Sequence, residues 1–330
     1  MNKLLSGKTV FAGLLLLLVS AGASSASASE KTFEQWLPEL RAEALERGIS
    51  KETLDAALEG IEPIPRVIEL DRSQPEFTLT FKQYRERVVP ESRIKMGRRL
   101  LEQHRELLEE IGKKYGIQPR FIVALWGIET DFGRLTGGFP VVQALATLAH
   151  DGRRSSYFRG ELLNALQILD QGHISPRDMQ GSWAGAMGQS QFMPSSFLNF
   201  AQDYDGDGRR DIWTTQADVF ASAANYLARS GWKDDQTWGR AVRLPRGFNI
   251  SLIGLETRKS IGWWQKQGVR RADGSDLPTR RLQASIVLPE EDNLQTAFMV
   301  YDNFRTTLKW NRSTYFALAV GLLSDAVANR

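Results

Sequence analysis

Residues 121–133 of this 330-residue chain read Phe121-Ile-Val-Ala-Leu-Trp-Gly-Ile-Glu-Thr-Asp-Phe-Gly133, an apolar run that stays free of charge until Glu129. A run of this length predicts a helix over 121–130 that is buried on most sides. On that helix, Glu129 shares a face with Trp126 and Ile122, three and seven residues earlier. The sequence therefore places an ionisable side chain at the end of an apolar helical stripe.

The setting of Glu129 favours the uncharged form of its carboxyl group. Desolvation beside the stripe raises a carboxyl pKa, and the negative end of the helix dipole opposes ionisation at the C-terminus. Both effects suit an acid that cleaves a glycosidic bond near neutral pH. The alternative is a glutamate that ends the helix and faces solvent. Asp131 points about 200° away on an ideal helix, so a paired carboxylate is not supplied locally.

Helical spacing of apolar residues recurs along most of the chain. One helical region spans 31–60, before Pro63 and Pro65 interrupt, and a long amphipathic helix spans 91–115 and closes at Gly116. Further helices are expected at 141–149, 156–170, 194–202, 216–230 and 313–327.

Two β-prone runs, 282–288 and 296–301, stand apart from this helical pattern and predict a small sheet within 240–301. The predicted fold class is therefore mainly α (α+β). With 42% hydrophobic residues, the chain can bury the core of one elaborated domain or two small ones.

Composition also excludes several classes of function. No block of basic residues with interleaved aromatics suits nucleic acid, and the formal charge is only +3. The chain has no cysteine, and its three histidines, His104, His150 and His173, lack zinc-ligand spacing. A serine hydrolase would require a nucleophile elbow, which the sequence lacks.

The first residues have the layout of a secretory signal peptide. Lys3 and Lys8 precede an apolar run over 10–19, and Ala26-Ser27-Ala28 offers small residues for cleavage. The alternative is a membrane anchor, but ten apolar residues fall short of the ~20 that span a bilayer. We expect export, cleavage near Ala28 and no transmembrane segment.

A glycine-rich segment over 182–196 joins small residues, amides and an apolar anchor. Gly185 and Gly188 permit a close approach of the backbone to a ligand. Gln189 and Gln191 carry amides that suit sugar hydroxyl or N-acetyl groups. The alternative is a tight turn between helices, which the physical pattern alone favours.

Three motifs together resemble the lytic murein transglycosylase B family (soluble periplasmic type): Gly127-Ile-Glu-Thr-Asp-Phe-Gly133, Gly185-Ala-Met-Gly-Gln-Ser-Gln-Phe-Met-Pro-Ser-Ser196 and Ala224-Asn-Tyr-Leu227. The resemblance covers nearly the whole mature chain, in order. It also takes in Gln74–Thr78, Asp151–Ser155 and Trp310–Tyr315.

The resemblance implies a lysozyme-like helical core with an additional N-terminal helical region. The expected organisation is a signal peptide over 1–28 and a transglycosylase domain over 29–330. Within that domain, the core takes up about 74–238 plus 302–330, and the β element about 240–301. The resemblance further implies a periplasmic location and peptidoglycan glycan strands as the binding partner.

The resemblance also implies the site residues and the reaction. Glu129 aligns with the catalytic acid/base of the family. Saccharide contacts are implied at Tyr84, Arg153, Arg154, Tyr157, Ser182, Gln191, Tyr226, Asn311 and Tyr315. The implied reaction cleaves the β-1,4 bond between N-acetylmuramic acid and N-acetylglucosamine without water and closes a 1,6-anhydro ring. Glu129 would act first as acid and then as base, with the substrate's N-acetyl group in place of a protein nucleophile. No cofactor is required for this chemistry.

An aspartate-rich loop, Asp203-Tyr-Asp-Gly-Asp-Gly-Arg-Arg-Asp-Ile-Trp-Thr214, resembles a helix–loop–helix calcium loop, with Gly208 at its sharp turn. The candidate ligands are Asp203, Asp205, Asp207, the backbone carbonyl of Arg209, and Asp211. Thr214 stands where such loops carry a bidentate carboxylate, so the alternative is a metal-free turn in which aspartates bond to the backbone. Any calcium would be structural.

Two other functions stay open at this point. A lysozyme-like muramidase would use the same cleft with water, and a non-catalytic protein would only bind peptidoglycan. The sequence leaves undecided exo- or endo-action, preference for cross-linked or peptide-free strands, oligomeric state and protein partners.

Overall fold

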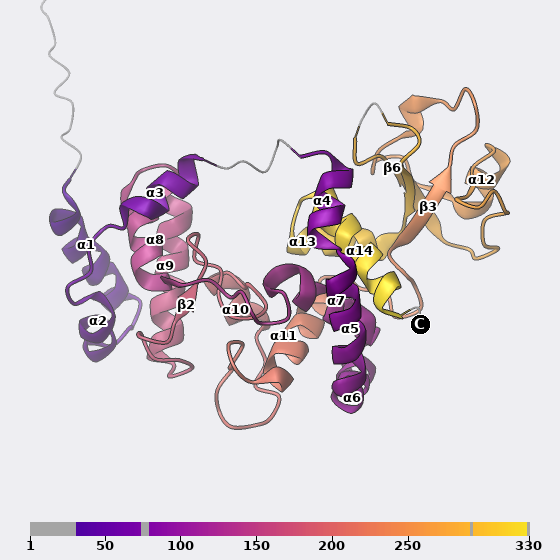
Figure 1. Ribbon diagram of the computed structural model, residues 1–330. Coiled ribbons are helices and arrows are strands. Elements are labelled where there is room, and N and C mark those ends of the chain that lie inside the picture. The colour runs from indigo at the N-terminus through magenta and orange to yellow at the C-terminus, as the bar shows by residue number, and fades with distance from the viewer. Residues whose placement is uncertain (1–30, 74–78, 291–292, 329–330) are drawn as a thin grey trace, which may run out of the picture.

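The computed structural model describes residues 31–73, 79–290 and 293–328. The predicted signal peptide, residues 1–28 with cleavage near Ala28, lies outside them. The described chain forms an elongated molecule with a helical body at one end, a second helical body in the middle and a β element at the other end (Figure 1). Within the described residues, no helix is both long enough and apolar enough to cross a membrane.

The N-terminal helical body brings the first three helices onto a later helical pair. Thr32 and Ser50 cap the first two helices, since their hydroxyls accept backbone N–H bonds from the first turn. Pro65, expected to interrupt, instead opens a helix at a position that needs no N–H donor. Leu40 and Leu166 are fully buried in the shared core. The helices are α1 (Phe33–Glu46), α2 (Lys51–Leu58), α3 (Pro65–Arg72), α8 (Val141–His150), α9 (Ser155–Asp170) and α10 (Pro194–Phe200).

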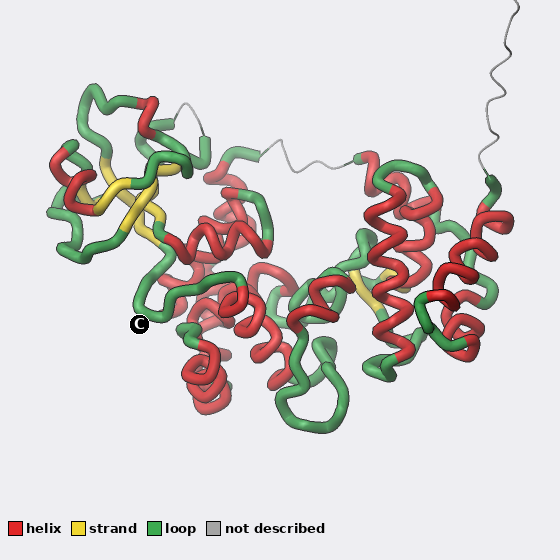
Figure 2. Tube along the Cα trace, turned by 180° about the vertical axis from the view of Figure 1, so that it is seen from behind, coloured by secondary structure: helices red, strands yellow, loops and turns green. Residues whose placement is uncertain are grey.

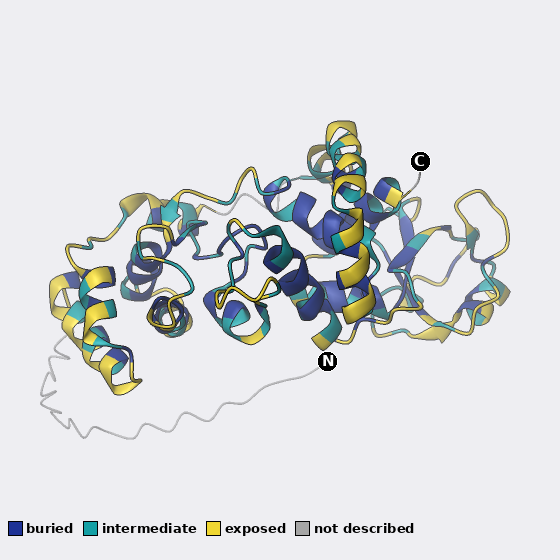
Figure 3. Cartoon of the chain, turned by 90° about the horizontal axis from the view of Figure 1, so that it is seen from below, coloured by how far each residue is buried: buried dark blue, intermediate teal, exposed yellow. Residues whose placement is uncertain are grey.

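The central helical body surrounds the apolar helix α7. Its helices are α4 (Phe81–Val88), α5 (Glu91–Gln103), α6 (Arg105–Tyr115), α7 (Pro119–Thr130), α11 (Gln216–Arg229), α13 (Asp302–Trp310) and α14 (Thr314–Ala328). Gly127 lets α7 pack tightly, because a Cβ there would lie 2.8 Å from the ring of Phe132. Buried residues gather in these central helices, whereas exposed residues follow the outer faces (Figure 3). The predicted burial of the 121–130 helix is confirmed, with Pro119 at its first turn.

The prediction of one helix over 91–115 is wrong. The chain forms α5 and α6, which meet at His104, whose backbone (φ −106°, ψ 22°) leaves the helical region. The ring of His104 packs edge-on against Trp126 and Phe220. These tertiary contacts coincide with the break, and the amphipathic pattern gives no local sign of it. Gly116 closes α6 in the left-handed conformation, as predicted.

The β element contains the five-stranded antiparallel sheet, in the order β4-β6-β7-β3-β5. Its strands are β3 (Gly239–Arg243), β4 (Lys259–Ser260), β5 (Arg270–Arg271), β6 (Gln283–Val287) and β7 (Ala297–Val300), with a 3-10 turn over Ile250–Leu252 and helix α12 (Ile261–Lys266). β6 and β7 coincide with the two β-prone runs, and Ile286 pairs with Met299 in their register. The strands gather at one end of the molecule, apart from a separate two-stranded sheet in the middle (Figure 2).

That separate sheet pairs β1 (Phe139–Pro140) with β2 (Gln180–Gly181) and leads into the glycine-rich segment. Gly181 and Phe192 each form an isolated bridge with Met187, so the segment folds back on itself. Five of the predicted helices match α8, α9, α10, α11 and α14 to within two residues at either end.

Candidate active site

Glu129 lies in the last turn of α7, just before the helix ends at Asp131 in the left-handed conformation (φ 51°). Residue Glu129 as a whole is partly exposed, while its carboxyl group is desolvated by burial. The predicted apolar stripe is present, since Ile122 and Trp126 line the same narrow space as Glu129. That space has a volume of about 10 Å³, enough for one water molecule.

The electrostatic setting of Glu129 favours a proton on its carboxyl group. Burial raises its pKa to about 7, although a hydrogen bond from Trp310 lowers it in part. That bond runs from indole Nε1 to Oε1 of Glu129, over 2.6 Å. Because an indole can only donate, Oε1 is the acceptor and the acid proton belongs on Oε2. Glu129 can therefore give up a proton near neutral pH from a defined oxygen.

Asp131, the carboxylate nearest to Glu129 in the sequence, already pairs with two arginines. Its Oδ1 accepts a 3.1 Å hydrogen bond from Nε of Arg93, and its Oδ2 pairs with Arg134. Among the described residues that line the narrow space, Glu129 is the only one with a carboxyl group. The arrangement thus offers one acid and no local second carboxylate.

The glycine-rich segment supports α7 through Gln189. Its Oε1 accepts a 2.7 Å bond from the indole of Trp126, its Nε2 donates to the carbonyl of Trp213, and its carbonyl accepts from Thr130. Gln189 is buried, so the expectation that its amide meets a sugar is wrong. Gly133 makes room for this amide, since a Cβ there would lie 2.3 Å from Oε1.

Gln191 keeps part of its amide available. Its backbone takes φ 48°, and its Nε2 donates to the carbonyls of Thr136 and Gly188. No described residue donates to its Oε1, which can accept from a ligand. Ser182 accepts a 3.0 Å bond from the N–H of Ala186, and its hydroxyl can still donate.

The predicted saccharide contacts include two groups of aromatic residues, one of which contains Trp310, the hydrogen-bond donor to Glu129. Tyr226 lies 4.7 Å from Trp310 between ring centroids, and its hydroxyl donates to the carbonyl of Lys309. Tyr84 lies 5.5 Å from Tyr315, which also contacts Phe81. The exposed Asn311 follows Trp310 and caps the N–H of Ser313. The predicted saccharide contacts in these two groups are Tyr84, Tyr226, Asn311 and Tyr315, and Trp310 joins them.

Arg153, Arg154 and Tyr157 lie together at the N-terminus of α9, away from the narrow space beside Glu129. All three are exposed. Both guanidinium groups pair with Asp71, a buried residue of α3. They therefore form a second patch of polar and aromatic surface.

Three residues that contact or support the site were not predicted from the sequence. Trp310 belongs to the Trp310–Tyr315 motif, but its spacing from Glu129 gives no sign of a contact. Asp71 carries no local signal because its partners lie more than 80 positions away. Ser190 lines the same narrow space as Glu129, and its buried hydroxyl has no hydrogen-bond partner among the described residues.

The aspartate-rich loop differs from the predicted ligand set. Carboxylate oxygens of Asp203 and Asp205 come within 4.8 Å of one another and of Asp218, which was not among the predicted ligands. Asp207 and Asp211 accept backbone N–H bonds from within the loop, with Arg209 donating to Asp207, and the three clustered carboxylates also accept backbone N–H bonds. Burial, with the nearby charges of Asp205 and Asp203, raises the pKa of Asp218 to about 6. Three carboxylates without a described cationic partner fit a divalent cation such as Ca²⁺.

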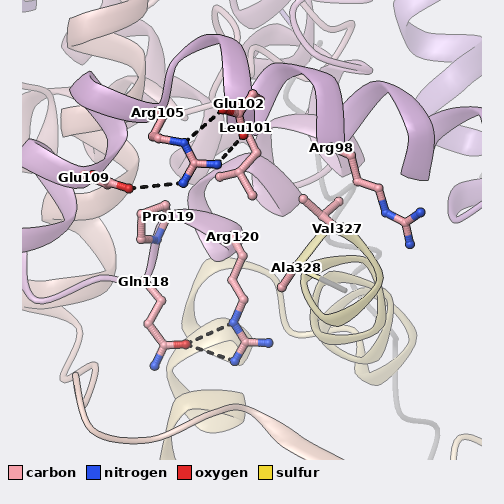
Figure 4. Close-up of a pocket in the computed structure, with 10 residues that line it drawn as sticks. All are labelled: Arg98, Leu101, Glu102, Arg105, Glu109, Gln118, Pro119, Arg120, Val327 and Ala328. Atoms are coloured by element: carbon pink, nitrogen blue, oxygen red, sulfur yellow. Dashed lines mark hydrogen bonds and ion pairs between the residues drawn. The ribbon is translucent and has the colours of Figure 1, made fainter. Parts of the chain in front are cut away.

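A larger hollow of about 480 Å³ lies elsewhere, between α5, α6, α7 and the end of α14 (Figure 4). Three arginines line it, but each is engaged. Arg98 donates to the carbonyl of Ala326, Arg105 pairs with Glu102 and Glu109, and Arg120 pairs with Asp325. Carboxylates therefore neutralise Arg105 and Arg120, whereas Arg98 bonds to a neutral carbonyl.

The family model for the Transglycosylase SLT domain matches residues 32–325. The chain belongs to this family. The match runs through all three bodies and includes Glu129, the glycine-rich segment and the aspartate-rich loop.

Individual relatives agree with this assignment to the Transglycosylase SLT family. The chain is 33% identical over 261 residues to membrane-bound lytic murein transglycosylase B of Escherichia coli K12, covering 74% of this chain and 66% of that protein. The chain thus spans just under two thirds of the length of that curated relative. The predicted resemblance to the lytic murein transglycosylase B family is confirmed.

Solved structures of family members extend the comparison. SltB3 of Pseudomonas aeruginosa, in complex with NAG-anhNAM-pentapeptide, is 45% identical, with a TM-score of 0.87 over 90% of this chain and 80% of that one. Escherichia coli Slt35 in complex with calcium is 28% identical, with a TM-score of 0.76 over 91% and 94%. The predicted mainly α fold with a lysozyme-like helical core is confirmed.

Proposed function

We propose that the protein is a lytic transglycosylase that cleaves the β-1,4 bond between N-acetylmuramic acid and N-acetylglucosamine in peptidoglycan. The observation that carries this proposal is Glu129, a single carboxyl group whose pKa burial raises to about 7 and which accepts a hydrogen bond from Trp310. The NAG-anhNAM-pentapeptide bound to SltB3 supports the same product class, since it contains an anhydro sugar.

The geometry supports a two-step reaction. Glu129 first donates its Oε2 proton to the glycosidic oxygen, and the C1–O bond breaks as the substrate's N-acetyl oxygen bonds to C1. The ionised Glu129 then accepts the proton of the muramoyl C6 hydroxyl. The C6 oxygen bonds to C1, the N-acetyl oxygen leaves, and a 1,6-anhydro ring closes. Glu129 returns to its starting protonation state without a second carboxylate.

The surrounding residues suit glycan strands. Gln191 and Ser182 supply an acceptor and a donor for hydroxyl or N-acetyl groups. Tyr226 offers an aromatic face that suits a sugar ring. Arg153 and Arg154 suit the carboxylates of the lactyl group or the stem peptide. Contacts from Tyr84, Tyr157, Asn311 and Tyr315 complete the proposed groove.

The remaining expectations also stay proposals. We propose a periplasmic protein with its signal peptide cleaved near Ala28. The proposed transglycosylase domain spans 29–330, with its core at about 74–238 plus 302–330 and its β element at about 240–301. A structural Ca²⁺ would be held by Asp203, Asp205 and Asp218; the calcium complex of Slt35 supports the proposal that a cation binds, without identifying its ligands here. No cofactor takes part in the chemistry.

Analysis of products by mass spectrometry tests this function. Purified peptidoglycan digested by the wild-type protein should yield muropeptides that are one water molecule lighter than the products of a muramidase, while Glu129→Gln should lower turnover by at least about 100-fold. Hydrated reducing ends as the main products would instead identify a lysozyme-like muramidase. A wild-type protein that binds peptidoglycan without product would identify a binding protein.

A further inference from the structure

Asp71 is a buried carboxylate next to the outer patch of the proposed groove. It lies in the last turn of α3, and its side chain is only 1% exposed. An ionised side chain in such a place requires cationic partners to offset its desolvation. Arg153 and Arg154 supply them, from a loop about 80 positions further along the chain.

The two arginines bind Asp71 in different ways. Arg154 donates from Nη2 to Oδ1 of Asp71, and Arg153 donates from Nη1 to its backbone carbonyl and has its Nε 3.5 Å from Oδ2. The ring of Phe158 lies under the guanidinium of Arg154, 4.9 Å away. Arg154 is thus held by a hydrogen bond to the carboxylate and by an aromatic face. Arg153 is held by a hydrogen bond to the backbone carbonyl and by a longer ion pair to Oδ2, which accepts no hydrogen bond from the described residues.

The other side of each guanidinium stays open. The side chains of Arg153 and Arg154 are 51% and 46% exposed. A guanidinium has five N–H donors, and the bonds to Asp71 use only some of them. The remaining donors can pair with a carboxylate on a ligand. A guanidinium group that is already held in one orientation binds a carboxylate more tightly than a mobile one, because less conformational freedom is lost on binding.

The backbone around the patch is also held in place. Arg154 takes a left-handed conformation (φ 59°) directly before α9, which is rare for a residue with a side chain. A second ion pair, from Arg72 to Asp151, joins the same end of α3 to the same loop. The contacts from α3 therefore define where both arginines point.

We propose that Asp71 is a positioning residue that orients Arg153 and Arg154 toward the carboxylates of the muropeptide. This inference rests on the proposed function, because it assigns these arginines to the substrate. It adds a specific role for α3, which lies outside the helices that hold Glu129. Asp71 would then contribute to affinity for acidic glycans and take no part in the chemistry.

The test measures binding by calorimetry in a Glu129→Gln background, so that no turnover occurs. The two probes are NAG-NAM-pentapeptide and the same compound with its carboxyl groups converted to methylamides. Asp71→Asn should weaken binding of the free acid about tenfold and leave binding of the methylamide unchanged. An equal affinity change for both probes would overturn the proposal, as would no change for either.

Asp170→Asn is the matched control. Asp170 ends α9 at its other end and accepts bonds from Ser50 and Thr53 of the α2 region, so it also ties an N-terminal helix to α9. Asp170→Asn should not alter the preference of the protein for the free acid over the methylamide. If Asp170→Asn lowers this preference as much as Asp71→Asn does, the role of Asp71 is merely structural. If Asp71→Asn does not fold, Arg154→Gln must still lower the preference for the free acid, or the proposal fails.

These outcomes are separate from those of the proposed function. The nature of the products formed from peptidoglycan depends on Glu129, whatever Asp71 does. Wild-type protein that forms anhydro products, combined with an unchanged probe preference in Asp71→Asn, would overturn only the role of Asp71.

Discussion

The indole Nε1 of Trp310 donates a 2.6 Å hydrogen bond to Oε1 of Glu129, across 181 positions of sequence. This bond joins the end of α13 to the last turn of α7. It stabilises the ionised carboxylate more than the protonated acid, because the acceptor then carries charge. Burial acts in the opposite direction, and the net result is a pKa of about 7. Trp310 is therefore both an anchor and a tuning group for the proposed acid/base.

Replacing Trp310 by Phe should move the pH dependence of activity. The loss of the donor raises the pKa of Glu129 further, so the fall in kcat/KM at alkaline pH should shift to higher pH. The rate at the optimum should drop about tenfold, since the carboxyl loses its fixed orientation. A pH–rate profile on soluble glycan fragments checks both effects. A lower rate with an unshifted alkaline limb would mean that Trp310 acts through packing alone.

Glu129→Gln should make the protein more stable as well as inactive. The folded pKa of Glu129 is raised, so the stability linked to its proton is fully present below pH 4.5 and is lost as pH rises through about 7. Above pH 7 the wild-type protein carries a desolvated charge that the glutamine variant lacks. Thermal unfolding of both proteins at pH 4.5 and pH 8 provides the measurement. The Tm of Glu129→Gln should exceed that of the wild type by more at pH 8 than at pH 4.5. A larger difference at pH 4.5 would contradict the claim that burial raises the pKa of Glu129.

Calcium should raise the Tm of the protein, more strongly at pH 7.5 than at pH 5.5. Asp218 has a pKa of about 6, so protons compete with the cation at the lower pH. A Ca²⁺ titration followed by differential scanning calorimetry measures the effect, with Asp218→Asn expected to abolish it. Activity at a temperature far below Tm should not change with a chelator, because the proposed chemistry uses no metal.

Gly133→Ala should destabilise the fold. The residue adopts φ 80°, and a Cβ would lie 2.3 Å from Oε1 of Gln189, the amide that holds Trp126. We expect a loss of about 1–3 kcal/mol in the free energy of unfolding. Gly138→Ala is the control in the same loop, because a Cβ there would meet no atom within 4 Å beyond its chain neighbours, and its backbone lies outside the left-handed region. Denaturant unfolding compares the two, and equal effects would show that the contact with Gln189 is unimportant.

Local patterns were sufficient for much of the fold. The apolar run of α7, the proline at its start and the β-prone runs of β6 and β7 each encode their structure over a few residues. The break between α5 and α6 was not predictable in this way. His104 sits in a continuous amphipathic pattern, and the rings that it contacts belong to α7 and α11.

The features of the proposed site likewise fall into those that a local sequence pattern predicts and those that depend on tertiary contacts. By itself, the sequence determined a single carboxyl at the end of an apolar helix, because the stripe of Ile122 and Trp126 is a local repeat. Only the tertiary structure decided that Trp310 donates to Glu129, that Asp71 holds Arg153 and Arg154, and that Gln189 serves the core. Each of these depends on the direction of a hydrogen bond or ion pair between distant segments, which helical periodicity does not encode.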